Sequence, residues 1–290
     1  MDVAHFSNGN ITELLYKTKP ALVFSNVPGD AERLIGMITH IKKVWRENRI
    51  PKVGTLAYEA STSRQGEDPR LFKMAQEKGV EFLPFDYFPF TATDFSAELR
   101  RIYEVKKADF VWLRGQPSQV GAIMKDVVRL GLKDKMTWVA CYFGYNEIVS
   151  QIAGLDAVDG MFAELSQASD VEDLPGVKFS RQLYTKYKRG AECPFVSYIA
   201  GTHLAMVAHE ATRRALEKVG IKKLGGRAIA DAVWSMNNFD VGGITPPIIM
   251  EQGNIALVRS VRMYQVDKGG KLRPISEWMP VPWILGRGGI

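Results

Sequence analysis

The sequence predicts an α/β protein built on parallel sheets that are flanked by helices. Between residues 52 and 165, short apolar segments alternate with amphipathic helical segments, which is typical of such a sheet. The strand segments are almost continuously apolar, as expected when helices cover both faces. This stretch has the size of one domain. Residues 1–50 and 177–255 each contain too few strands for a sheet, so we expect them to form a second, split domain together.

The first fifty residues predict two strands and one helix. Alternating side chains from Val3 to Asn8 and an apolar run from Ala21 to Val27 are typical of short strands. Asp30 is suited to cap a helix. The apolar residues from Ala31 to Trp45 recur on one helical face, and Pro51 follows the end of the helix.

The alternating region and the part after it predict the remaining elements. The predicted strands are Val53–Tyr58, Val80–Phe88, Asp109–Leu113, Trp138–Tyr142 and Met161–Leu165. The helices between them are Arg70–Lys78, Asp94–Lys106, Gln119–Leu130 and Glu147–Ile152. A polar crossing segment follows at 166–176. Three helices (Val177–Lys188, Phe195–Val219, Arg227–Met236) and a hairpin (Ser260–Asp267, Leu272–Trp278) complete the chain.

Composition excludes several classes of protein. The 290 residues are 46% hydrophobic and 24% charged, which excludes a mainly disordered, collagen-like or coiled-coil protein. The net charge of +6 comes from basic residues that are spread along the chain beside acids, and we expect no nucleic-acid partner. No run reaches the roughly 20 apolar residues of a membrane span. Residues 1–20 show no signal-peptide pattern.

Motifs of catalysis and metal binding are missing from the sequence. It contains no G-x-S-x-G, P-loop, H-E-x-x-H or C-x-x-C pattern, so we expect no catalytic residue, no metal site, no cofactor and no enzyme. His203 and His209 are six residues apart and do not share a helix face as a metal pair would. Cys141 ends an apolar strand and is predicted to be a buried thiol. With Cys193 it leaves one bridge or two free thiols open.

The carboxyl ends of the predicted strands carry glycine, amide, hydroxyl and aromatic residues. These ends are Asn8-Gly9-Asn10, Tyr58-Glu59-Ala60-Ser61, Gly115-Gln116-Pro117-Ser118 and Tyr142-Phe143-Gly144. Ligands of open α/β sheets bind beyond such ends. The residue types suit holding a small molecule better than transforming it. They are also ordinary turn residues, and the residues alone leave this alternative open.

Several short motifs follow one another in a defined order. They are the loop Asn8–Leu14, the turn Phe24–Ala31, the strand Lys52–Tyr58, the helix start Thr93–Ala97, the strand Ala108–Val111, the helix end Leu130–Leu132 and the turn Gly269–Lys271. In order and spacing they resemble the type I periplasmic-binding-protein family, specifically the branched-chain amino acid (Leu/Ile/Val-like) substrate-binding proteins of ABC transporters. The resemblance runs through most of the chain.

The resemblance implies a two-lobe fold with a ligand clamped between the lobes. It implies a first lobe formed by residues 1–51 and 169–262, and a second lobe formed by residues 52–168 and 263–290. The family begins with an export signal and further strand–helix units. We therefore expect this chain to be N-terminally truncated, with its first lobe incomplete.

The resemblance also implies a set of ligand-binding residues. These are Asn8, Gly9, Asn10, Tyr58, Gln116, Tyr142 and Phe195. Gly9 and Asn10 would donate hydrogen bonds to a ligand carboxylate from the first lobe. Tyr58, Gln116 and Tyr142 would face the ligand from the second lobe, and Phe195 would be an apolar wall.

Two positions depart from the family's amino-acid binders. Tyr142 stands where those proteins place an acid that pairs with the ligand ammonium, and Glu59 replaces a glycine after Tyr58. An unpaired buried ammonium would cost several kcal/mol. A carboxylate, amide or aromatic acid without an amine therefore fits better, unless Glu59 replaces the missing acid.

The expected function is capture of an amino acid or a small carboxylate or amide for an ABC importer. The implied partners are this small-molecule ligand and a membrane permease, and the implied location is periplasmic or extracytoplasmic. A cytoplasmic small-molecule sensor of the same fold that regulates a partner protein is the alternative. An enzyme with an unrecognised site would need an acid/base pair or a nucleophile, and the strand ends offer neither.

Overall fold

The chain folds into two compact units. A computed structural model describes residues 3–9, 22–190 and 194–284. Unit 1 comprises Met1–Gly29, Ser166–Ser260 and Pro282–Ile290, and unit 2 comprises Asp30–Leu165 and Val261–Val281. Three of these segments make unit 1 and two make unit 2, so both are discontinuous in sequence.

Unit 2 is built on a mainly parallel sheet, as the sequence predicts. The strand order is β4-β3-β6-β7-β8-β9-β10, with β5 also paired to β3 and β11 to β9. The strands are β3 (Lys52–Tyr58), β4 (Glu81–Phe82), β5 (Asp86–Phe88), β6 (Phe110–Arg114), β7 (Thr137–Ala140), β8 (Phe162–Leu165), β9 (Ser260–Val266), β10 (Leu272–Pro274) and β11 (Met279–Pro280). The pairs from β4 to β8 are parallel, whereas β9 is antiparallel to β8 and to β10.

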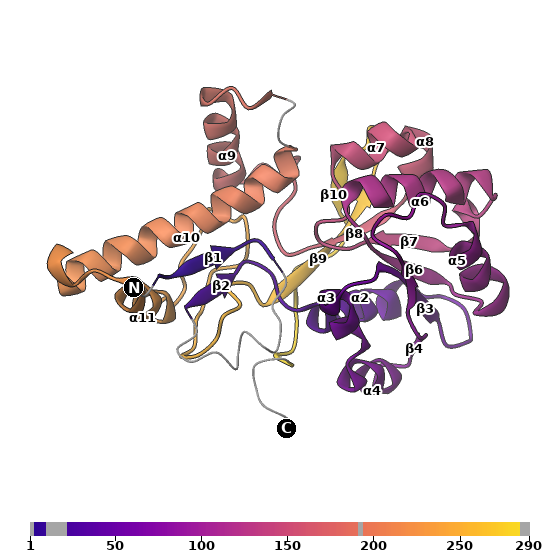
Figure 1. The fold of residues 1–290 in the computed structure, drawn as a ribbon, viewed down its shortest axis with the longest axis horizontal. Coiled ribbons are helices and arrows are strands. Elements are labelled where there is room, and N and C mark those ends of the chain that lie inside the picture. The colour runs from indigo at the N-terminus through magenta and orange to yellow at the C-terminus, as the bar shows by residue number, and fades with distance from the viewer. Residues whose placement is uncertain (1–2, 10–21, 191–193, 285–290) are drawn as a thin grey trace. The chain divides into compact units, whose positions relative to one another are not determined.

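Helices cover both faces of this sheet (Figure 1). They are α2 (Asp30–Val44), α3 (Ser61–Arg64), α4 (Pro69–Glu77), α5 (Ser96–Arg100), α6 (Pro117–Arg129), α7 (Glu147–Ala153) and α8 (Leu155–Val158). α6, α7 and α8 pack together on one face, and α2 and α4 pack together on the other (Figure 1). Two predicted elements are divided. The helix expected at 94–106 continues from α5 as a π-helical segment, Arg101–Val105.

The strand predicted at 80–88 forms two short strands. β4 pairs with Lys52 and Val53, whereas β5 pairs with the last three residues of β3, from Leu56 to Tyr58. Pro84 lies between β4 and β5. Proline has no N–H to donate to a ladder, which accounts for the interruption.

Helix α2 belongs to unit 2, although the expected lobe boundary placed residues 1–51 in the first lobe. Most side chains of α2 are buried. Gly36 approaches β9 so closely that an added Cβ would lie 2.1 Å from Val261 Cγ2. The His40 ring packs edge-on against Phe162 of β8. The helix is therefore part of the unit 2 core, and the unit boundary falls between Gly29 and Asp30.

Unit 1 combines a short parallel strand pair with helices. β1 (His5–Ser7) pairs with β2 (Val23–Ser25), and Ser25 also bridges to Ala256. The helices are α9 (Pro175–Lys186), α10 (Phe195–Val219) and α11 (Gly226–Trp234). Phe24 of β2 is fully buried and meets the Trp234 ring edge-on, 5.8 Å between centroids. β2 and the helices thus share one apolar core.

His203 is a buried, unsatisfied histidine in the middle of α10. Its ring is 1% exposed, and neither ring nitrogen has a hydrogen-bond partner among the described residues. Burial lowers its pKa from 6.5 to about 4, because the imidazolium would lose its hydration. Above pH 6.5 the ring is mainly neutral in both the folded and the unfolded state, and as the pH falls from 6.5 toward 4 the unfolded state binds the proton more tightly, so the free energy of unfolding falls.

We expect His203→Leu to remove this pH dependence. Urea unfolding of the wild type should lose about 3 kcal/mol of stability through this group between pH 6.5 and 4. The leucine variant should lose correspondingly less and be at least as stable at pH 7, because an unpaired buried polar group is removed. His209→Leu, an exposed site on the same helix, is the control and should keep the wild-type profile. Identical profiles for all three proteins would contradict this account.

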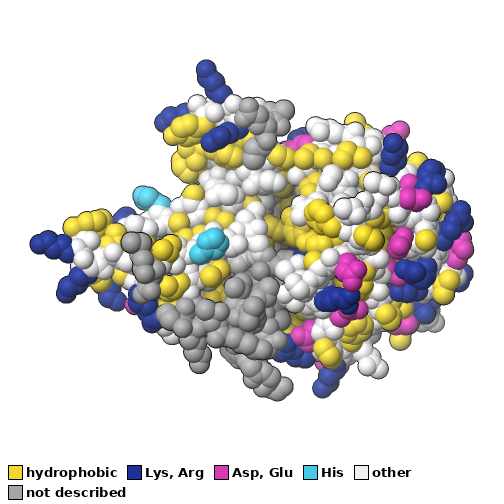
Figure 2. All heavy atoms as spheres, in the orientation of Figure 1, with side chains coloured by type: hydrophobic (Ala, Val, Ile, Leu, Met, Phe, Trp, Pro, Cys, Tyr) yellow, Lys and Arg dark blue, Asp and Glu magenta, His cyan; other side chains and the backbone are white. Residues whose placement is uncertain are grey.

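The charged surface of unit 2 is mixed in sign. On the face shown in Figure 2, Lys and Arg side chains lie among Asp and Glu side chains. Several form exposed pairs, such as Arg64 with Glu59 and Arg100 with Glu104. Among the described residues, no helix has the length and apolar character needed to span a membrane.

Candidate functional site

The sheet of unit 2 has a topological switch point between β3 and β6. From β3 the chain continues to β4 and β5 on one side, then crosses to β6 on the other. Ligands of such sheets bind at the carboxyl ends of the strands where the order reverses. β3 ends at Tyr58 and β6 at Arg114, with Ala57 and Arg114 in register. These two side chains therefore mark the candidate site.

Tyr58 and Arg114 are in direct contact. Nη1 of Arg114 donates a hydrogen bond to the Tyr58 hydroxyl at 2.8 Å. The guanidinium carbon lies 4.9 Å from the Tyr58 ring centroid and 5.1 Å from that of Phe143. Phe90 meets the Tyr58 ring edge-on. The site thus has aromatic walls around one cation–hydroxyl pair.

A buried ion network supports Arg114 from behind. Asp30, the first residue of α2, accepts hydrogen bonds from Arg114 Nε and from Arg33 Nη2. Arg33 Nη1 donates to Glu164 Oε1 at 2.5 Å. All four side chains are 0% exposed, and two cations face two anions. Mutual pairing is needed here because each buried charge alone would cost several kcal/mol.

Burial shifts the pKa values of Glu164, a member of the network, and of Cys141, which lies beside it. Burial raises the pKa of Glu164 to about 7, while the Arg33 charge acts to lower it. Burial also raises the pKa of the Cys141 thiol to about 11. Cys141 is therefore buried, as the sequence predicts, and its thiol is protonated at neutral pH.

The other predicted residues of unit 2 lie along the same edge. Tyr142 follows β7 and is 5% exposed. Its amide donates to Glu164 Oε1 at 3.2 Å, and its ring centroid is 5.8 Å from the Arg33 guanidinium. Gln116 is exposed just before α6, where its backbone N–H donates to Gln119 Oε1. The ion network thus links Tyr58 to Tyr142, with Gln116 two residues beyond Arg114.

Four predicted residues, Asn8, Gly9, Asn10 and Phe195, belong to unit 1. Asn8 and Gly9 follow β1, and the Ser25 hydroxyl donates to the Gly9 carbonyl. Asn10 lies outside the described residues. Phe195, the first residue of α10, is 8% exposed and packs against Tyr184 edge-on, with the Arg181 guanidinium 4.5 Å from its ring centroid.

None of the four charged residues of the network was predicted from the sequence as part of the site, and Asp30 was expected only to cap a helix. Glu59, considered as a substitute acid, is exposed and pairs with Arg64 at 2.8 Å. The acids of this edge are instead Asp30 and Glu164, both bound to arginines. A signal was present, because Arg114 and Glu164 each occupy a strand that is otherwise apolar.

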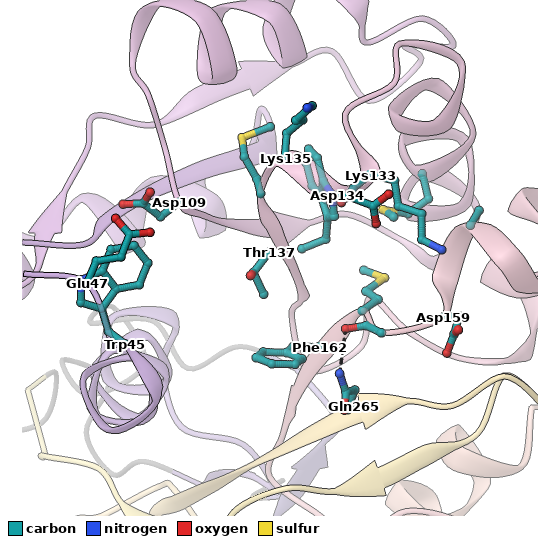
Figure 3. A pocket seen from close by; sticks show the side chains of 16 residues that line it. Trp45, Glu47, Asp109, Lys133, Asp134, Lys135, Thr137, Asp159, Phe162 and Gln265 are labelled. Atoms are coloured by element: carbon teal, nitrogen blue, oxygen red, sulfur yellow. Dashed lines mark hydrogen bonds between the residues drawn. The ribbon is translucent and has the colours of Figure 1, made fainter.

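A pocket of about 460 Å³ lies at the opposite edge of the unit 2 sheet (Figure 3). Its lining includes residues at or just before the starts of strands, among them Asp109, Thr137 and Phe162. None of the predicted ligand-binding residues lines it. Asp109 is already bound by Arg49 and by the Lys52 amide. Within the described part of the chain, no three His, Cys, Asp or Glu side chains converge as metal ligands would.

Comparison with protein families confirms the resemblance. The family model described as "Periplasmic binding protein" matches residues 23–271. The chain belongs to this family. The strand order and flanking helices of unit 2 are those of an α/β sheet, as expected for its type I fold. A comparison with curated protein sequences found no match.

Solved structures of the same fold include several ABC transporter proteins. A branched-chain amino acid ABC transporter protein from Thermus thermophilus with bound valine is 23% identical, with a TM-score of 0.80. The alignment covers 96% of this chain and 72% of that one. A leucine-binding protein from Thermotoga maritima is 18% identical, with a TM-score of 0.72 and coverages of 95% and 72%. A solute-binding protein from R. palustris in complex with benzoate is 16% identical, with a TM-score of 0.74 and coverages of 96% and 72%.

Proposed function

We propose that this chain is the solute-binding component of an ABC importer and that it captures a small carboxylate or amide. Membership of the periplasmic binding protein family supports the general role. The implied partner is a membrane permease, and the implied location is extracytoplasmic. Binding, rather than chemistry, is the whole of the proposed activity.

One observation favours a carboxylate or amide over an α-amino acid. At the carboxyl edge of the unit 2 sheet, Asp30 and Glu164 are buried and already paired with Arg33 and Arg114. They are therefore poor partners for a ligand ammonium. The Tyr58 hydroxyl, whose oxygen accepts a hydrogen bond from Arg114, instead offers an O–H donor, which suits an oxygen acceptor. Among the similar structures, the R. palustris protein holds benzoate and the Thermus thermophilus protein holds valine, so this preference rests on the charges of this edge and not on the comparisons.

Titration calorimetry with a ligand panel tests this proposal. The panel contains straight-chain, branched and aromatic monocarboxylates, their primary amides, and the amino acids leucine and valine. We expect at least one carboxylate or amide to bind with micromolar or tighter affinity, and both amino acids to bind at least about tenfold more weakly. Tight binding of leucine or valine without any carboxylate binding would contradict the proposed ligand class.

Replacing Tyr142 tests where the ligand binds. Tyr142→Ala removes an aromatic wall of the carboxyl edge and should weaken the best ligand at least about tenfold. Tyr187→Ala is the control, because Tyr187 lies in unit 1 and is 58% exposed. Equal weakening by both substitutions, or by neither, would argue against this edge as the site.

A further inference from the structure

We propose that Arg114 is a positioning residue: by donating a hydrogen bond to the Tyr58 oxygen, it leaves the Tyr58 hydroxyl to act as a donor toward the ligand. The site thereby selects ligands with an acceptor oxygen over ligands with an ammonium. This inference rests on the proposed function, because it assumes that Tyr58 faces the captured ligand. It concerns Arg114, which the sequence motifs did not single out.

The direction of the Arg114–Tyr58 hydrogen bond follows from chemistry. A guanidinium has only donors, so the Tyr58 oxygen must be the acceptor in the 2.8 Å contact. The hydroxyl proton of Tyr58 then points elsewhere. Within the described part of the chain, no acceptor receives that proton. Because Tyr58 is only half-buried, its O–H can be offered to a bound molecule.

Arg114 is held in this role by its other contacts. Its Nε donates to Asp30, which Arg33 also binds, so the guanidinium has a fixed plane. The rings of Tyr58 and Phe143 lie within about 5 Å of it. Since Arg114 is 0% exposed, we infer that it acts through Tyr58 and not by touching the ligand.

The consequence is a preference for one kind of ligand end group. A carboxylate or carbonyl oxygen can accept the Tyr58 proton and is favoured by the nearby cation. An ammonium has only donors, so it cannot accept the Tyr58 proton, and it meets a hydroxyl oxygen that already accepts a hydrogen bond from Arg114. Arg114 therefore determines which end group is preferred, although Tyr58 is the residue that contacts the ligand.

The test compares a matched ligand series in a set of variants of the full chain. The ligands are the tightest carboxylate from the panel, its primary amide and the primary amine of the same carbon skeleton. Tyr58→Phe removes the hydroxyl, Arg114→Met removes the donor to it, and Arg114→Lys keeps a positively charged donor. Tyr87→Phe is the control, because the Tyr87 hydroxyl donates its hydrogen bond to Glu67, which is not part of the Arg114 network. Circular dichroism and thermal unfolding establish that each variant is folded.

We expect Tyr58→Phe to weaken carboxylate binding at least about tenfold and to leave amine binding unchanged. Arg114→Met should reduce the carboxylate-to-amine affinity ratio at least about tenfold, whereas Arg114→Lys should retain most of it. Tyr87→Phe should behave as the wild type. If Arg114→Met does not fold, Arg114→Gln takes its place, because glutamine lacks the positive charge of Arg114, and it should also reduce the carboxylate-to-amine affinity ratio.

Two results would overturn the inference, and they differ in what else they overturn. If the wild type binds a carboxylate but Tyr58→Phe and Arg114→Met keep its carboxylate-to-amine affinity ratio, the role assigned to Arg114 is wrong and the proposed function stands. If the wild type binds no member of the panel, the proposed function fails and this inference fails with it.

Discussion

Replacing Arg33 with methionine is expected to destabilise unit 2 by about 3–5 kcal/mol at pH 8. Arg33 is 0% exposed and is bound to both Asp30 and Glu164. After the substitution, Asp30 still has Arg114, but Glu164 is left as a buried carboxylate without its cation. Urea unfolding followed by tryptophan fluorescence measures the loss.

The same variant makes a prediction about pH. Burial raises the pKa of Glu164 to about 7 in the presence of Arg33, and loss of Arg33 should raise it further. The folded state then binds more protons than the unfolded state, so stability falls as the pH rises through the folded pKa. Wild type should level off above pH 7 while Arg33→Met continues to lose stability. The gap between them should therefore widen above pH 7.

A double variant distinguishes a lost charge partner from lost packing. Arg33→Met with Glu164→Gln removes one cation and one anion, and leaves the Asp30–Arg114 pair balanced. The side-chain oxygen of the glutamine can still accept the hydrogen bond that the Tyr142 backbone N–H donates to Glu164. We expect this double variant to recover most of the stability at pH 8. A double variant as unstable as Arg33→Met at every pH would show that packing, not charge, explains the loss.

The second large effect is expected in unit 1, where Phe24→Ala should cost about 3–5 kcal/mol. Phe24 is 0% exposed on β2 and packs against both Phe6 and Trp234. Its loss opens a cavity where the strand pair meets the helical core. Hydrogen exchange followed by mass spectrometry should show a larger rise in exchange rate, relative to the wild type, in α10 and α11 than in β3 and β6.

Phe179→Ala is the matched control for this substitution. Phe179 is also a phenylalanine of unit 1, on α9, but it is 43% exposed. We expect it to change stability by less than about 1 kcal/mol. Equal effects of the two substitutions, or an equal rise of exchange in both units for Phe24→Ala, would contradict the described core.

The elements that the sequence predicted well are those fixed by local pattern. The helix Phe195–Val219 has the predicted bounds, and β3 differs from the predicted strand by one residue at its start. Periodicity and glycine ends are enough for such segments. The boundary of the first lobe depended instead on which sheet α2 packs against, which its own periodicity does not specify.

The candidate site divides in the same way. Tyr58 and Tyr142 were predicted because they end strands, and the carboxyl ends of parallel strands meet at one edge. Arg114 and Asp30 are 84 positions apart in the sequence, and Arg33 and Glu164 are 131 positions apart. No local sequence pattern predicts pairs at such separations. Only the fold brings the charges together and shows that the acids of this edge are already bound.

A crystal structure of the chain with its tightest carboxylate or amide tests the central claim most directly. We expect the ligand's acceptor oxygen within hydrogen-bond distance, about 2.5–3.0 Å, of the Tyr58 hydroxyl, at the carboxyl ends of β3 and β6. Arg114 should remain bound to Tyr58 and Asp30. A ligand found instead in the pocket of Figure 3, at the opposite edge of the sheet, would contradict the account.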